Sequence, residues 1–215
     1  MDQPFSPADP ALLGVLDGAI DAEGKIGLAL QSLGPIGGRD VLLIDADRGL
    51  RQAQLEALGA RVAGLAAPDA ASPSLANQPP DSADVLVAFW TGLGLGPAAQ
   101  RAKLAALSRV LRPEGRILLV EAYGRDDTTH LFAEPAREAR LVAANDRRGA
   151  MLAAGFRVRV LHCWWSFVDL GAMNAVLAAL FPATGVDFAA TLRRPRLSFK
   201  VAVYHRTVER PIQAP

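Results

Sequence analysis

The sequence predicts an α/β fold, a three-layer sandwich in which a mostly parallel, doubly wound sheet is packed between helices. The prediction rests on two stretches, residues 41–65 and 81–124, which each read as a strand, a helix and a second strand. The strands are short, nearly unbroken apolar runs, as is typical of strands buried on both faces. A unit of this length joins two parallel strands by a right-handed crossover.

The unit at 81–124 shows each of these features. Its first strand is expected at 84–90, and its helix begins near Pro97, a residue suited to a first helical turn. Leucines then recur at helical spacing until Pro113 ends the helix and Gly115 turns the chain. The second strand follows at 116–121. Ligands of such sheets bind beyond the carboxyl ends of the strands, so the functional rim is expected there.

The other elements are placed by the same reasoning. Residues 10–33 predict two helices or one bent helix, with a break near Gly24. The remaining strands are expected at 41–45, 61–65, 156–164 and 197–205, and the remaining helices at 50–58, 145–154 and 170–180. We expect a single domain, in which an N-terminal helical segment (1–36) packs on an α/β domain (37–215).

The composition restricts the function. A hydrophobic fraction of 51% excludes a disordered chain, and a net charge of +1 gives no overall field that would attract nucleic acid. Cys163 is the single cysteine, so a disulfide framework is excluded and a reducing compartment is expected. Because no signal peptide or membrane-spanning run is visible, we expect a soluble, cytoplasmic protein with no membrane or nucleic-acid partner.

One family pattern covers roughly residues 37–207. The stretch ADVLVAFW…LAALSRVLRPEGRILLVEAYG, with its turn at 111–115, resembles the second half of a class I S-adenosylmethionine (SAM) dependent methyltransferase. The Ala154-Gly155-Phe156 entry to a later strand is a further match. The resemblance implies the sheet order second, first, third, fourth, last, fifth, with an antiparallel last strand. It also implies SAM as cofactor and methyl transfer to an unknown small-molecule acceptor.

The cofactor loop departs from the family pattern. The family's G-x-G-x-G falls on Asp45-Ala46-Asp47-Arg48-Gly49, so only Gly49 keeps its glycine. Aspartates there add bulk and repel a carboxylate, although either could accept a hydrogen bond from an ammonium group. Capping of the next helix and a local pair with Arg48 are the structural alternative. The resemblance implies a cofactor across the first and third strands, at Asp45, Asp47, Gly49, Phe89 and Trp90.

Two further features weaken the expected cofactor site. The family's ribose-binding acid, at the end of the second strand, is replaced by Ala66 and Ala67. Only about eighteen residues, 66–83, then precede the next strand, and four of them are prolines. A crossover with its own helix and strand hardly fits there. We therefore expect the family's third strand to be truncated and SAM binding to be weak.

Polar and aromatic side chains gather after two of the predicted strands. The loop after Glu121 brings Tyr123, Arg125, Asp126 and His130 to the rim, and these are the candidate catalytic residues. Trp164 and Trp165, at the far end of a later strand, are candidates for an apolar wall against the substrate; core packing is the alternative. No metal site is expected, because His130 has no second ligand at suitable spacing.

Three classes of function remain open: a SAM-dependent methyltransferase, a non-catalytic binding or partner protein with the same fold, and a nicotinamide-dinucleotide enzyme. The last rests on Gly94 and Gly96, which match G-x-G-x-x-A between a strand and a helix. The pattern lies in the middle of the domain rather than after the first strand, which disfavours it. A possible homodimer is compatible with any of the three classes.

Overall fold

The computed structural model describes residues 10–45, 50–66, 77–90, 97–131, 139, 141–143, 145–146 and 148–208. Six strands form one sheet: β1 (Asp40–Asp45), β2 (Arg61–Ala66), β3 (Ala83–Phe89), β4 (Leu111–Ala122), β5 (Arg157–Ser166) and β6 (Arg196–Thr207). Their order is β2-β1-β3-β4-β6-β5, as predicted. β1 to β4 are parallel, and β6 runs antiparallel to both of its neighbours.

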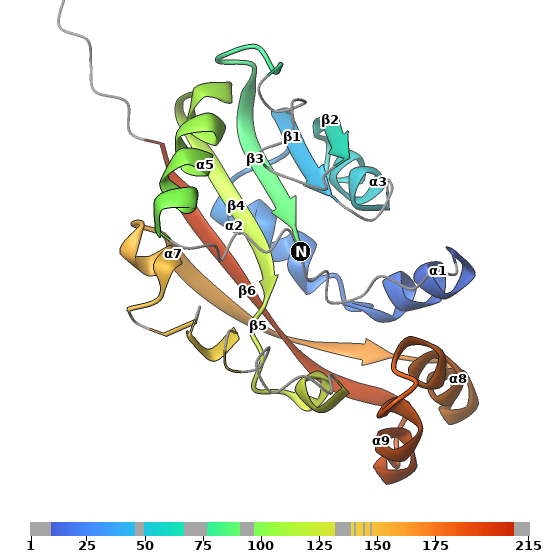
Figure 1. The fold of residues 1–215 in the computed structure, drawn as a ribbon. Helices are drawn as coiled ribbons and strands as arrows, with labels where there is room; N and C mark the ends of the chain where they lie inside the picture. Colours follow the sequence, from blue (N-terminus) through green and yellow to red (C-terminus); the bar gives the residue numbers. More distant parts are fainter. Residues whose placement is uncertain are drawn as a thin grey trace, which may run out of the picture.

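Helices cover both faces of this sheet (Figure 1). They are α1 (Pro10–Ala19), α2 (Lys25–Leu33), α3 (Leu50–Ala57), α5 (Pro97–Val110), α7 (Ala150–Ala153), α8 (Leu170–Leu180) and α9 (Gly185–Thr191), with a 3-10 turn, η1 (Asp127–Leu131). α5 and α7 pack on one face, where Leu107 and Met151 join the core; α2 and α8 pack on the other through Leu30 and Leu177. The predicted three-layer α/β sandwich is confirmed.

The N-terminal segment forms two helices rather than one bent helix. Ile20 pairs with Trp165 of β5 in an isolated antiparallel bridge, and the next residue, Asp21, has a positive φ of 58°. The Asp21 carboxylate then accepts hydrogen bonds from the backbone N–H groups of Lys25 and Ile26 at 2.8 and 2.7 Å. These bonds cap α2. The division of a single domain into an N-terminal helical segment (1–36) and an α/β domain (37–215) stays a prediction.

Three boundaries differ from the prediction. The helix expected at 145–154 is confined to Ala150–Ala153, because the Asp146 side chain accepts a hydrogen bond from the Arg148 N–H and holds a turn there. β4 begins at Leu111, before the predicted turn, because Leu111 already pairs with Ala83. α9 was not predicted; it lies within the connection between α8 and β6.

The turn inside β4 explains why a glycine follows Glu114. A Cβ on Gly115 would lie 2.8 Å from the Arg112 carbonyl oxygen and 3.2 Å from that of Asp84. Such approaches are too close for any side chain. Gly115 therefore lets the chain fold back tightly enough for β4 to pair with β3.

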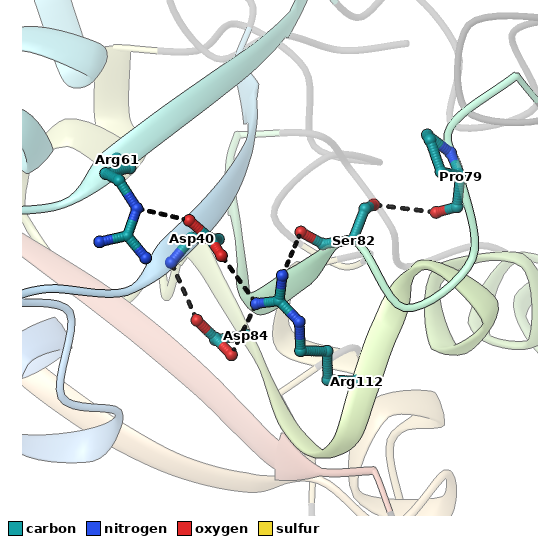
Figure 2. A network of polar contacts seen from close by, with 6 residues as sticks. All are labelled: Asp40, Arg61, Pro79, Ser82, Asp84 and Arg112. Carbon is teal, nitrogen blue, oxygen red and sulfur yellow. Dashed lines mark hydrogen bonds and ion pairs between the residues drawn. The ribbon is translucent and has the colours of Figure 1, made fainter.

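A network of charged groups ties the amino ends of the strands together (Figure 2). Asp40 of β1 accepts hydrogen bonds from Arg61 of β2 at 2.7 Å and from Arg112 of β4 at 2.8 Å. Arg112 also contacts Asp84 of β3 at 2.9 Å and the Ser82 carbonyl at 3.3 Å. Since the network lies at the end opposite the predicted rim, we assign it to strand alignment.

The predicted truncation of the sheet beside β2 agrees with the described residues. β2 is the outermost strand on this side, and residues 77–82 form turns rather than a strand. Residues 67–76, including the remaining part of the short connection, lie outside the described residues. None of the helices in the described part of the chain has the length and apolar character needed to cross a membrane.

Candidate functional site

The carboxyl ends of β1, β2 and β3 meet at one edge, which we call the carboxyl edge and define by Asp45, Ala66 and Phe89. The Asp45 backbone pairs with Ala66 on one side and with Phe89 on the other. Three of the predicted cofactor positions therefore share one place in the fold: Asp45, Phe89 and the adjacent Trp90. Asp47 and Gly49 lie outside the described residues, as do Gly94 and Gly96.

A buried arginine lies on this edge. Arg51, near the start of α3, is only 2% exposed, and its guanidinium carbon lies 5.1 Å from the centre of the Phe89 ring. Its Nη1 donates a hydrogen bond to Gln54 at 3.0 Å. A guanidinium over an aromatic face is an attractive cation–π arrangement. The edge thus holds a fixed positive charge beside the end of β3.

Trp90, the residue after β3, has a strained conformation. Its φ is 52°, which is rare for a bulky residue, while its N–H still donates to the Val120 carbonyl at 2.9 Å. The ring is 7% exposed and packs against Phe199 of β6, with ring centres 5.8 Å apart. Strain of this kind persists where the surroundings hold it, and it gathers at binding sites.

The N-terminal segment brings a carboxyl group to the same region. Burial raises the pKa of Asp21 above its ordinary value; the capping N–H groups of Ile26 and Lys25, the Cys163 thiol and the Arg51 charge oppose this rise. Burial also raises the pKa of Cys163, to about 12, and the Asp21 charge adds to the effect. The thiol is therefore protonated at neutral pH and unsuited to nucleophilic chemistry.

Sequence reasoning did not identify Asp21 or Arg51 as part of the site. A signal for Arg51 was available, because it stands four residues before Leu55, which is also buried, so both occupy the inner side of α3. Asp21 gave no comparable signal, since its position depends on the bridge between Ile20 and Trp165.

The four candidate catalytic residues lie in one loop after β4, but they differ in burial and in their contacts. The Asp126 carboxylate is buried and accepts hydrogen bonds from Thr128 at 2.7 Å, from Thr129 at 3.3 Å and from the Lys200 N–H at 2.7 Å. The first two bonds lie within the loop, and the third fixes the loop to β6. Asp126 is therefore occupied within the protein.

The other three candidates lie along the same loop, between the end of β4 and the end of η1. Arg125 is exposed, has a φ of 58°, and its carbonyl accepts a hydrogen bond from the Lys200 ammonium group at 2.7 Å. His130 is exposed and stacks on Phe188 of α9, with ring centres 6.2 Å apart. Tyr123 is half-buried, and its N–H donates to the Lys200 carbonyl at 2.8 Å.

The two candidate substrate tryptophans do not line one wall. Consecutive strand residues point to opposite faces, so Trp164 and Trp165 are separated by the sheet. Trp165 is 0% exposed and packs in the core against Phe181 and Phe199. Trp164 is half-buried, and the Arg196 guanidinium carbon lies 4.5 Å from its ring centre. Trp164 alone is available for contact with a ligand.

Within the described residues, no group of three or more histidine, cysteine or acidic side chains is placed to hold a metal ion. No family model matches the sequence, and no significant match occurs among the curated proteins.

Solved structures do match the chain. One is a chain of the complex between the Trm112 methyltransferase activator and a proposed methyltransferase from Haloferax volcanii: the TM-score is 0.52 at 13% identity, over 95% of this chain and 96% of that one. Together with the strand order, this likeness decides the fold. The chain has the fold of class I SAM-dependent methyltransferases.

Two other methyltransferase-fold structures match at slightly lower scores. A SAM-dependent methyltransferase from Aquifex aeolicus gives a TM-score of 0.49 at 16% identity, over 91% of this chain and 98% of that one. A proposed type II methyltransferase from Anaeromyxobacter dehalogenans gives 0.49 at 18%, over 96% and 100%. At these identities the likeness concerns the fold alone.

Proposed function

We propose that this protein is a SAM-dependent methyltransferase-like protein that binds its cofactor weakly and acts on a small-molecule acceptor. The observation that carries the proposal is the meeting of Asp45, Ala66 and Phe89 at the carboxyl edge of the sheet. Ligands of open α/β sheets bind at this edge, where the order of the strands reverses. When bound, SAM supplies an already activated methyl group, so the protein's task is mainly to position it.

The residues at the edge fit one end of SAM better than the other. The buried Arg51 guanidinium provides a positive charge that suits the carboxylate of the methionine part. Ala66, at the end of β2, carries no carboxylate for the ribose hydroxyls. We therefore assign Arg51 to the methionine end and expect the ribose end to be poorly held.

We place the acceptor on the side of the loop after β4. Arg125 and His130 are exposed there, and Tyr123 is half-buried beside them. Trp164 remains a candidate for the apolar wall. Asp126 is less suited to catalysis than the sequence indicated, because its carboxylate is engaged by Thr128, Thr129 and Lys200. The single, protonated cysteine agrees with the cytoplasmic location that we propose.

Isothermal titration with SAM, S-adenosylhomocysteine and NAD tests the proposal directly. Weak but saturable binding of the first two, without NAD binding, is the expected result. Gly49→Val should abolish that binding while circular dichroism shows a folded protein, because a β-branched side chain would block the approach of the ligand to the loop. Unchanged affinity in this variant would move the site away from β1. Binding of NAD alone would favour the Gly94/Gly96 alternative.

A non-catalytic partner protein with this fold is the second candidate. It is favoured by the filled carboxyl edge, where Arg51, Phe89 and Trp90 are all less than 10% exposed. One of the similar structures is a complex with a methyltransferase activator, which makes a partner protein or a homodimer a reasonable alternative for this chain. Absence of SAM and S-adenosylhomocysteine binding at millimolar concentration, in a folded sample, would support it. Light scattering would identify a homodimer.

A further inference from the structure

A cavity lies at the opposite end of the sheet from the carboxyl edge. It has a volume of about 530 Å³, and we call it the basic hollow. Its lining residues are Arg116, Ala154, Gly155, Arg157, His205, Arg206 and Thr207. Arg116 pairs with Val85 near the start of β3 and with Thr207 near the end of β6, which places the hollow at the amino ends of the parallel strands.

The lining carries positive charge that no lining carboxylate balances. Three of its seven residues are arginines, and none is acidic. Burial lowers the pKa of His205, and the nearby charges of Arg157 and Arg116 lower it further. Three other charged residues stand two positions from a lining residue in the sequence: Arg159, on the same strand as Arg157, Glu114, which is exposed and lines a neighbouring hollow, and Glu209, which lies outside the described residues.

Backbone carbonyls hold two of these arginines in place. The Nη1 of Arg116 donates to the Leu33 carbonyl at the end of α2, at 2.6 Å, and the Nη1 of Arg206 donates to the Ala154 carbonyl at 2.8 Å. A guanidinium has five N–H donors, so each arginine keeps others for a ligand. The space beside Gly155 is open, since a Cβ added there would meet nothing within 4 Å.

We propose that the basic hollow binds a small molecule that carries a phosphate or pyrophosphate group. Its volume lies in the range of about 300–1,000 Å³ that is usual for ligand sites. Planar guanidinium groups match phosphate oxygens through paired hydrogen bonds, and several fixed positive charges favour a multiply charged anion over a single carboxylate.

The proposed phosphate site is separate from the candidate methyl-transfer site. Ala122 lies six positions after Arg116 on β4, which at about 3.3 Å per residue amounts to roughly 20 Å along the strand. The proposal therefore does not depend on SAM binding, and the two can fail independently.

Titration of the histidines with inorganic pyrophosphate tests the phosphate site. The chain has three, His130, His162 and His205, and only His205 lines the hollow. At constant ionic strength, the imidazole NMR signals of His205 should shift saturably and its pKa should rise, because a bound anion offsets the arginine charges. His130 and His162 should stay unchanged. Equal shifts of all three histidines, or a shift that never saturates, would overturn the proposal.

Two matched variants on β5 distinguish binding in the basic hollow from general attraction by positive charge on the protein surface. Arg157→Gln removes a lining charge and should weaken pyrophosphate binding about tenfold or more. Arg159→Gln removes the same charge two residues away, where the side chain donates to Ser32 instead, and should change binding less than about twofold. Similar losses in the two variants would contradict the proposal, as long as both melt cooperatively like the parent.

A short single-stranded oligonucleotide provides the second arm of the experiment. Its phosphates offer the same chemistry within a macromolecule. If the oligonucleotide binds and pyrophosphate does not, the surface serves nucleic acid and the small-molecule proposal is overturned. Pyrophosphate binding with no stronger binding of the oligonucleotide supports it.

Discussion

Asp126 and Arg125 are neighbours in the loop after β4, yet the structure gives them opposite roles. The Asp126 carboxylate is buried and accepts two hydrogen bonds from within the loop and one from the Lys200 N–H of β6, whereas the Arg125 side chain is exposed. We predict that Asp126→Ala lowers the free energy of unfolding by about 2–4 kcal/mol, because buried donors lose a charged partner. Urea denaturation measures the change.

Arg125→Ala serves as the matched variant for that measurement. It should leave the urea midpoint almost unchanged and lower ligand affinity or turnover if Arg125 faces the acceptor. A large loss of stability in Arg125→Ala would assign this residue to the internal bonding of the loop. A stable Asp126→Ala protein would instead return Asp126 to the list of catalytic candidates.

The junction between α1 and α2 shows how one residue connects helices to the sheet. Asp21 caps α2 and has a positive φ, and the preceding Ile20 bridges to β5. Asp21→Ala should destabilise the protein by about 2 kcal/mol, because it removes the cap and because alanine adopts the left-handed region less readily than aspartate does. Asp21→Gly loses the same cap without that strain, and should cost about 1 kcal/mol. Thermal melts of the two variants measure the loss of the cap and the added backbone strain. Equal losses of stability would show that the backbone strain is relieved in the folded protein.

The charged network across the amino ends of the strands predicts a pH dependence. Hydrogen bonds and charges from Arg61 and Arg112 hold the pKa of Asp40 below its ordinary value. For Asp84, burial acts in the opposite direction, but the Asp40 N–H and Arg112 outweigh it, and the pKa is again lowered. A lowered pKa in the folded state stabilises the protein above the unfolded pKa of 3.8, and this contribution is lost as the pH falls below that value.

Arg112→Gln should therefore lower stability at pH 6 and flatten the loss of stability between pH 6 and pH 3. Urea midpoints at the two pH values measure the slope. Arg39→Gln is the control, since it removes the same charge from an exposed position near the network. A wild-type slope in Arg112→Gln would show that other carboxylates dominate the acid response. These groups are partly exposed to solvent, so the effect should also decrease in high salt.

At the scale of the whole molecule, local patterns predicted the sheet, whereas the site depended on contacts between distant residues. Apolar runs in the sequence predict buried strands such as β3. The proline and glycine of Pro113-Glu114-Gly115 predict the turn. The spacing from Leu55 indicated that Arg51 lies on the inner side of α3, but its contact with Phe89 of β3 joins residues far apart in the sequence and could not be predicted from a local pattern. Trp165 was considered for the rim because its apolar character is the same in a pocket wall and in a core.

The affinity for SAM is the property of the whole molecule that tests these inferences most directly. A SAM pocket normally gains hydrogen bonds from loop amides, from an acid at the ribose and from a third-strand region at the adenine. Here Ala66 and Ala67 replace the acid, and the connection at 66–83 is short. Two lost bonds at about 0.5–1.5 kcal/mol each, with crowding at Asp45 and Asp47, total about 3 kcal/mol, or roughly a hundredfold in Kd.

We therefore predict a Kd for SAM weaker than about 100 μM for the isolated chain. Isothermal titration measures it, and thermal denaturation gives an independent check. With that Kd, 1 mM SAM stabilises the folded state by at most about 1.4 kcal/mol through mass action, so the melting temperature should rise by only a few degrees. Micromolar binding would show that Arg51 and the N-terminal helices complete the site, and it would favour an active methyltransferase. Tight binding only in a dimer or with a partner protein would show that the missing contacts come from a second chain.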